Sequence, residues 1–217
     1  MEIQYLLNNL TINEEVQSKM VKDLKGTNNI VFVASNFSNA ALNDREFQNQ
    51  LMWFHNIGLD FAKSYIIDDR IGEYTASELL KDADIVFLND GNPIDQMKSI
   101  NSYGLKDELA NIPNVIGLGY GACNLAEDVR LSKCEEKNIN EHINYHGLGL
   151  NNINVEPHFD FDNLTHNSKE LFPRSIMNEI LCMTPDAAVR ISDDVTYINS
   201  FYLLRDGKIE EIKTKSK

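Results

Sequence analysis

Residues Asn114 to Asp128 read NVIGLGYGACNLAED: a short apolar run passes at once into glycines and then into helix-forming residues. A buried strand that turns directly into a helix is the unit of parallel sheets. The turn matches G-x-Nu-x-G, where small residues flank a nucleophile because the strained backbone passes close to its neighbours. Gly119 stands at the nucleophile's position. The segment therefore predicts a sharp strand-to-helix turn that lacks the reactive side chain.

Similar apolar runs alternate with segments of helical period along the rest of the chain. We expect strands at residues 3–7, 29–35, 60–67, 84–89, 114–118, 151–155, 187–191, 196–204 and 208–212. We expect helices at residues 13–24, 43–58, 75–83, 92–100, 105–110 and 167–183. This order predicts an α/β fold of three layers, in which a mostly parallel central sheet carries helices on both faces.

Local signals set some of the expected boundaries. Asn43 is the predicted N-cap of the second helix, with Glu46 at its capping-box position, and Thr75 is the predicted N-cap of the third helix. Asp206-Gly207 predicts a hairpin turn between the last two strands. Residues 132–144 are polar and weakly patterned, so we expect them to form loops on the site side of the sheet.

Composition predicts one soluble globular domain that spans residues 1–217. Hydrophobic residues make up 42% of the chain and charged residues 24%, and this length can bury one sizeable core. A net charge of -13 without a basic patch argues against binding to nucleic acid or to an anionic membrane. We expect a monomer or a homodimer.

The chain lacks the sequence signals of export and of metal or cofactor binding. Its opening apolar run is too short for a signal peptide, and three cysteines without a CxxC pair fit a reducing compartment, so we expect a cytoplasmic protein. The only histidines with metal-ligand spacing are His142 and His146, and no third ligand accompanies them. Because no nucleotide-binding motif is present either, we expect neither a metal nor a cofactor.

Three sequence blocks resemble one known family. IGLGYGACNLAE is similar to the IG-x-SAGA-x-NLA segment of the aspartyl dipeptidase (peptidase E) family, serine peptidases that include cyanophycinase. FLNDGNPIDQM resembles that family's GGNT motif, and GLGLNNINVEPHFD resembles its GLGL…PHF block. The blocks occur in the family's order. The resemblance implies a flavodoxin-like architecture related to class I glutamine amidotransferase domains.

The resemblance also implies roles for individual positions. Gly119 falls where the family has its serine nucleophile, Tyr120 where it has alanine, and His158 where it has its catalytic base. Glycine has no side chain that can attack a carbonyl, and loss of a triad nucleophile costs on the order of a millionfold in turnover. We therefore expect no serine-type acyl transfer.

The GGNT-like block departs from the family in a second way. Asp90 replaces the first glycine, whereas Gly91 and Asn92 match. In the family, backbone amides beside this motif and after the serine stabilise an oxyanion. A carboxylate ~4 Å from that developing charge would oppose it by ~1 to 4 kcal/mol. The site is expected to be altered beyond the loss of one hydroxyl.

Other residues are weak substitutes for the missing serine. Cys123 lies one turn into the expected helix and should point into the packing, and Tyr120 carries a phenol of pKa ~10 without a dedicated base. His158 is the best remaining polar candidate, although it could also be an ordinary loop histidine. The family's third triad member has no clear counterpart among Asp128, Glu135 and Glu136.

Three functional hypotheses remain open at this point, and whether the chain is an enzyme is undecided among them. The first is an inactive or altered member of the peptidase family that binds a small acidic peptide or an amino acid. The second is an active hydrolase or dipeptidase that uses water activated by His158 or a non-standard nucleophile. The third is a structural or regulatory partner protein whose pocket is plugged by Tyr120.

Overall fold

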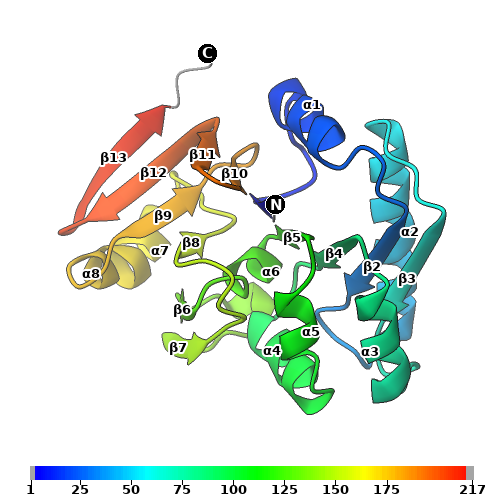
Figure 1. The fold of residues 1–217 in the computed structure, drawn as a ribbon. Coiled ribbons are helices and arrows are strands. Elements are labelled where there is room, and N and C mark those ends of the chain that lie inside the picture. The colour runs from blue at the N-terminus through cyan, green and yellow to red at the C-terminus, as the bar shows by residue number, and fades with distance from the viewer. Residues whose placement is uncertain (1–2, 214–217) are drawn as a thin grey trace.

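The computed structural model describes residues 3–213 and is built around a seven-stranded sheet (Figure 1). The strand order is β11-β10-β1-β5-β4-β2-β3, and the five strands from β1 to β3 are parallel. β10 and β11 extend the sheet in antiparallel pairing. The strands are β1 (Ile3–Leu7), β2 (Asn29–Val33), β3 (Lys63–Ile67), β4 (Ile85–Leu88), β5 (Asn114–Leu118), β10 (Ala188–Ile191) and β11 (Val195–Ile198). β5 lies at the centre.

Helices cover both faces of this sheet because successive strand residues point to opposite sides. One core contains Phe32 and Phe87 of the sheet and Phe54 of α2. The other contains Val31 and Val86, which pack with α3, α4 and α5. The helices are α1 (Glu14–Asp23), α2 (Ala40–Asn56), α3 (Glu73–Lys81), α4 (Pro93–Ser102) and α5 (Lys106–Ala110). The predicted three-layer α/β fold with a mostly parallel sheet is confirmed.

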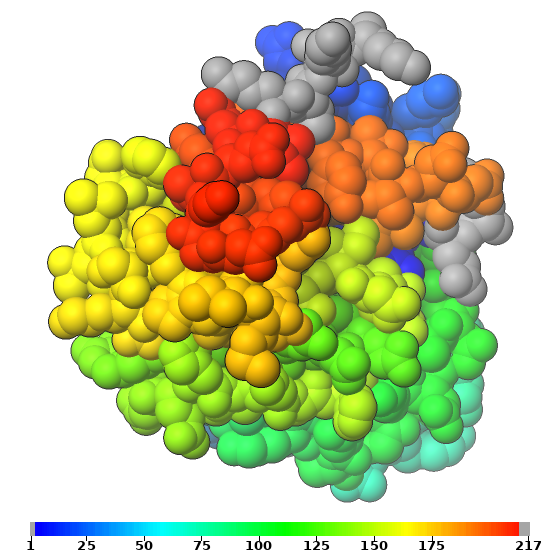
Figure 2. Space-filling model, turned by 90° about the vertical axis from the view of Figure 1, so that its left-hand side faces the viewer, coloured from blue at the N-terminus to red at the C-terminus, as the bar shows by residue number. Residues whose placement is uncertain are grey.

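A second, four-stranded sheet lies beside the first, in the order β13-β12-β9-β8. Its strands are β8 (Val155–Glu156), β9 (Ile180–Met183), β12 (Ser200–Arg205) and β13 (Lys208–Lys213). A continuous helical segment packs on it through Leu171, and comprises α7 (Leu164–His166), the π-helical η2 (Asn167–Leu171) and α8 (Phe172–Ser175). Figure 2 views the molecule from this side, where the residues coloured yellow to red lie above those coloured green.

Several predicted element boundaries were wrong. α2 begins after Asn39, whose side chain accepts a hydrogen bond from the amide of Leu42. Asn43 therefore lies inside the helix, where it is buried and donates to the main-chain oxygen of Asn36 and to Asp68. The N-cap of α3 is Gly72 rather than Thr75. At Asn43 the local cap signal failed because its side chain instead makes tertiary contacts with Asn36 and Asp68.

The largest errors fall in the last third of the chain. The helix expected at 167–183 ends at Ser175, and the final residues form β9 instead. The strand expected at 196–204 is divided by Asn199, whose φ of 71° sends β11 and β12 into different sheets. Only the end of the strand expected at 151–155 forms, as part of β8. The hairpin turn at Asp206 and Gly207 is present, with φ of 52° and 69°.

No helix within residues 3–213 is both long enough and apolar enough to cross a membrane.

Candidate functional site

The predicted sharp turn stands at the carboxyl end of β5. Gly119 has φ of 53° and ψ of -123°, and its amide donates to the main-chain oxygen of Leu7 over 2.8 Å. A Cβ on Gly117 would lie 2.4 Å from the Cα of Ala122, and one on Gly121 would lie 2.5 Å from the main-chain oxygen of Leu88. Close backbone packing therefore explains both flanking glycines.

The helix after the turn is shorter than expected. α6 (Tyr120–Cys123) has only four residues, and the chain then turns into β6 (Asp128–Leu131), which pairs with β7 (Ile143–His146). The dipole of such a short helix contributes little to binding an anion at its N-terminus. Anion binding at this site must depend on individual donors.

The Asp90 side chain occupies the space that a side chain at residue 119 would need. A Cβ on Gly119 would lie 2.4 Å from Asp90 Oδ1 and 2.8 Å from His158 Nε2. Asp90 Oδ1 also accepts a hydrogen bond of 2.9 Å from the Tyr120 amide. This amide follows the nucleophile position, so the Asp90 carboxylate lies both in the nucleophile's space and on a neighbouring amide donor.

The second carboxylate oxygen of Asp90 is held by two side chains. Lys137 Nζ donates to Oδ2 over 2.7 Å, and His158 Nε2 lies 3.2 Å from the same oxygen. Burial of Asp90 favours its neutral form, but the hydrogen bond and charge of His158, together with Lys137, outweigh burial and lower the pKa of Asp90 to about 2. The carboxylate is therefore ionised at neutral pH.

His158 reaches the site from a strained loop that follows β8. Its φ is 55°, a left-handed conformation that is uncommon for a residue with a Cβ, and its amide donates to Asn8 Oδ1 over 2.6 Å. Asn8 is buried directly after β1. The ends of β1, β5 and β8 thus bring His158 beside Gly119, although the two residues are 39 positions apart in the sequence.

Gly91 and Asn92 support the site without lining the adjacent pocket. Gly91 has φ of 151°, and a Cβ on it would lie 2.1 Å from Ser35 Oγ. Asn92 caps α4 by accepting from the amides of Ile94 and Asp95, and its Nδ2 donates to the main-chain oxygen of Lys137. These contacts fix the backbone that follows Asp90.

Sequence reasoning missed Lys137 and Asn8. Lys137 belongs to the 3-10 turn η1 (Glu135–Lys137), inside the segment 132–144 that was expected only to form loops. No motif distinguishes Lys137 from other surface lysines, and Asn8 is equally inconspicuous. Only the expected position of the loop on the site side of the sheet could have directed attention to Lys137.

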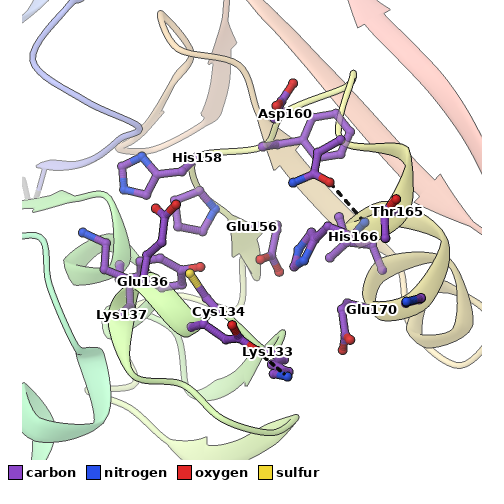
Figure 3. A pocket seen from close by; sticks show the side chains of 17 residues that line it. Lys133, Cys134, Glu136, Lys137, Glu156, His158, Asp160, Thr165, His166 and Glu170 are labelled. Carbon is purple, nitrogen blue, oxygen red and sulfur yellow. Dashed lines mark hydrogen bonds and ion pairs between the residues drawn. The ribbon is translucent and has the colours of Figure 1, made fainter.

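A pocket of about 790 Å³ opens beside His158 (Figure 3). One wall is residues 133–137, and the other is residues 156–171. Tyr120 lines this pocket and is itself buried. The lining carries charges of both signs: Glu135, Glu136, Glu156, Asp160 and Glu170 are acidic, and Lys133, Lys137 and Lys169 are basic.

Glu156 is a buried acid in the pocket lining that sequence reasoning also missed. Its Oε2 accepts from Ser132 Oγ over 2.7 Å and lies 3.4 Å from Arg174 Nη1. Burial raises the pKa of Glu156, although the charge of Arg174 acts in the opposite direction. These contacts join β8 to the end of β6 and to α8.

In the described part of the chain, none of the acids considered as a third triad member forms a hydrogen bond or an ion pair with His158. Asp128 pairs with His146 over 3.0 Å, and Glu135 pairs with Lys133 over 2.7 Å. Glu136 lines the pocket. Within residues 3–213, Asp90 is the one carboxylate hydrogen-bonded to His158.

The alternative nucleophiles are enclosed by packing. Cys123 is buried and its Sγ lies 3.4 Å from the main-chain oxygen of Val155, and burial raises the pKa of its thiol. Burial and the charge of Glu156 likewise raise the pKa of Tyr120. Neither group is therefore ionised at neutral pH.

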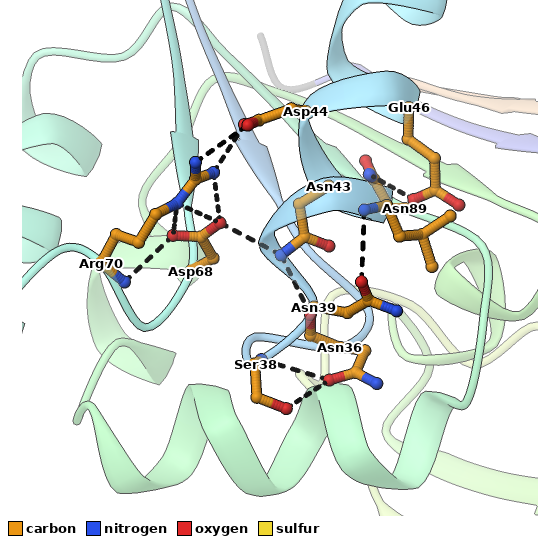
Figure 4. A network of polar contacts seen from close by, with 10 residues as sticks. Asn36, Ser38, Asn39, Asn43, Asp44, Glu46, Asp68, Arg70 and Asn89 are labelled. Carbon is orange, nitrogen blue, oxygen red and sulfur yellow. Dashed lines mark hydrogen bonds and ion pairs between the residues drawn. The ribbon is translucent and has the colours of Figure 1, made fainter.

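A polar network continues from the site along the carboxyl ends of β2, β3 and β4 (Figure 4). Asn89, next to Asp90, donates to Glu46 over 3.2 Å. Burial raises the pKa of Glu46, and the charge of Asp90 contributes to the same shift. Further along, Asp68 is buried and accepts from Asn43 and Arg70. Glu46 thus accepts a hydrogen bond within this network instead of forming the predicted capping box.

Comparisons with known proteins agree with this fold. The sequence model of peptidase family S51 matches residues 8–202. A comparison with curated proteins found no significant match. Among solved structures, a candidate peptidase E from Listeria monocytogenes superposes with a TM-score of 0.67 at 14% identity, and the alignment covers 91% of this chain and 98% of that one. The structural likeness shows a shared flavodoxin-like fold.

Proposed function

The chain belongs to peptidase family S51, and from this premise we propose that it is a pseudoenzyme: it has lost serine-type hydrolysis and retains the pocket as a binding site for a small peptide or an amino acid. The observation that carries the proposal is the Asp90 carboxylate in the side-chain space of Gly119, 2.4 Å from the position of a Cβ. While the Asp90 carboxylate is docked there, a serine hydroxyl cannot occupy the same volume.

The surroundings of residue 119 support loss of activity by a second route. Serine-type acyl transfer needs amide donors that are free to bind the developing oxyanion. The Tyr120 amide already donates to Asp90 Oδ1 over 2.9 Å. An ionised carboxylate on this donor opposes a second negative charge, so both the nucleophile and one oxyanion donor are unavailable.

The charged residues that line the pocket favour a ligand that carries both a positive and a negative charge. Each of its two walls carries both carboxylates and ammonium groups, and an amino acid or a short peptide also has both an ammonium and a carboxylate. Within the described residues, Lys169 is the lysine of the lining left available to an acidic side chain, because Lys137 is paired with Asp90 and Lys133 with Glu135. This arrangement supports the small acidic peptide or amino acid expected from the sequence.

Two measurements on the unmodified protein test the proposal. We expect no hydrolysis of Asp-X dipeptides above the uncatalysed rate, and we expect saturable binding of the same dipeptides by isothermal titration calorimetry. Glu136→Gln together with Lys169→Gln should weaken binding, since both residues line the pocket. Hydrolysis at a rate typical of peptidases, or an absence of binding at millimolar dipeptide, would contradict the proposal.

One observation favours a second candidate, hydrolysis by water that His158 activates. The 3.2 Å contact between Asp90 Oδ2 and His158 Nε2 resembles the acid-to-histidine pairing that orients a general base. This candidate predicts slow dipeptide turnover that disappears in His158→Ala. Turnover unchanged by that substitution would exclude His158 as the base.

The expected cytoplasmic location belongs to the same proposal. Cys123, Cys134 and Cys182 are unpaired, which supports a reducing compartment. Fractionation of cells that produce the protein would test it directly.

A further inference from the structure

We infer that the Tyr120 amide, Lys137 Nζ and His158 Nε2 together form a carboxylate-binding site that Asp90 occupies as an internal ligand, and that a ligand carboxylate binds by displacing the Asp90 side chain. The inference rests on the proposed binding role of the pocket and adds to it the chemical group that is recognised. It also names a residue that competes with the ligand.

The three donors already surround a carboxylate. The Tyr120 amide lies 2.9 Å from Asp90 Oδ1, while Lys137 Nζ and His158 Nε2 lie 2.7 Å and 3.2 Å from Oδ2. A main-chain amide, an ammonium and an imidazole are typical donors to an anionic oxygen, and bonds that involve a charged group are stronger than neutral ones. The position of the Asp90 carboxylate therefore shows which chemical group these three donors bind, and in which orientation.

Two of the donors are accessible from the pocket. Lys137 and His158 both line it, with side chains 26% and 36% exposed. The Asp90 side chain is 23% exposed but is not part of the pocket lining. A ligand in the pocket thus meets Lys137 and His158 first and competes with Asp90 for both.

Packing and capping contacts hold the backbone that follows Asp90, whereas, among residues 3–213, the Asp90 carboxylate is held by the three donors alone. Gly91 packs against Ser35 so closely that a Cβ would not fit, and Asn92 is fixed as the cap of α4. Displacement therefore requires rotation about the side-chain bonds of Asp90 and no movement of the strand. Two carboxylates cannot share the three donors because their charges repel, so binding of the ligand and docking of Asp90 exclude each other.

An internal competitor lowers the apparent affinity for an external ligand by the fraction of molecules in which the site is free. Asp90→Ala should remove the competitor and leave the three donors. We expect acetate to bind this variant at least tenfold more tightly than the unmodified protein, measured by the saturable shift of the Tyr120 amide in proton–nitrogen NMR spectra. Acetamide, which has the same shape without the charge, should produce no saturable shift.

Asp95→Ala is the matched control, because Asp95 is an exposed acid nearby on α4 that pairs with Lys98. Its acetate affinity should equal that of the unmodified protein. Adding Lys137→Gln to Asp90→Ala should weaken acetate binding at least tenfold. Asp90→Gly provides the same test if the alanine variant does not fold. Equal acetate affinity with and without Asp90, or equal binding of acetamide, overturns the inference.

The outcome separates this inference from the proposed function. Acetate binding gained by Asp90→Ala, without any dipeptide binding to the unmodified protein, supports the carboxylate site and rejects the proposed function. Dipeptide binding without a gain in acetate affinity retains the proposed function and rejects displacement of Asp90.

Discussion

Asp90 Oδ1 lies 2.4 Å from the position that a Cβ on Gly119 would take, so one residue fills the volume that the other leaves empty. The two positions are 29 residues apart and meet because β4 and β5 are adjacent parallel strands that end at the same edge of the sheet. The residues at positions 119 and 90 are therefore sterically coupled. A side chain at residue 119 is incompatible with the docked Asp90 carboxylate, whereas removal of the Asp90 side chain leaves Gly119 without a clash.

This dependence predicts the behaviour of revertants. Gly119→Ser alone should remain inactive on Asp-X dipeptides, because the Asp90 carboxylate blocks the new side chain. Gly119→Ser combined with Asp90→Gly should raise kcat/KM at least 100-fold above either single variant, although triads without their acid are slower by about 10⁴-fold. Gly119→Ser with Asp95→Gly is the control. If the serine variant alone were active, steric exclusion by Asp90 would be disproved.

The lowered pKa of Asp90 predicts a pH-dependent contribution to stability. A carboxyl whose pKa falls from 3.8 to about 2 on folding stabilises the native state fully above pH ~4 and loses that contribution as pH falls to ~2. The shift corresponds to about 2 kcal/mol at neutral pH. Urea unfolding of the protein and of Asp90→Asn, from pH 7 to pH 2, should show a difference that shrinks across this window. A difference that stays constant with pH would contradict the assignment.

The buried pair of Glu156 and Arg174 predicts a second, opposite pH effect. Arg174→Ala leaves a buried carboxylate without its cation and should cost about 3–5 kcal/mol at pH 7. Because burial raises the pKa of Glu156, ionisation of this residue opposes folding above its unfolded pKa, and that cost disappears at low pH. The loss of stability in Arg174→Ala should therefore be smaller at pH 5 than at pH 8.

Arg205→Ala is the control for that experiment, because Arg205 forms an exposed ion pair with Glu179. Its effect should stay below about 1 kcal/mol at both pH values. A loss in Arg174→Ala that does not change with pH would argue against Glu156 as the group responsible.

Gly91 predicts a steric effect on folding. A Cβ there would lie 2.1 Å from Ser35 Oγ, and φ of 151° is strained for any other residue. Gly91→Ala should lower the free energy of unfolding by about 3 kcal/mol in urea titrations. Gly72→Ala, where no atom lies within 4 Å of the added Cβ, should have little effect. Partial recovery in Gly91→Ala with Ser35→Gly would identify the clash as part of the cost.

The central features of the fold could be predicted because they depend on local patterns. Residues 114–118 form an apolar strand with glycines after it, and this pattern alone predicted a sharp turn at Gly119, which the structure contains. The predictions failed where distant groups compete for a segment. Residues 180–183 have a pattern compatible with a helix, but they form a strand that pairs with β8 and β12. Asn43 was predicted as a helix N-cap, but its side chain donates a hydrogen bond to Asp68 instead.

The sequence by itself determined the parallel sheet, the turn and the absence of a side chain at residue 119, since each follows from the identity and spacing of neighbouring residues. Tertiary structure alone decided which group lies in the space beside Gly119 that a side chain there would need. Asp90, Lys137 and His158 come from three segments that only strand order and loop packing bring together, and a carboxylate's effect depends on the charges and donors within a few ångströms of it.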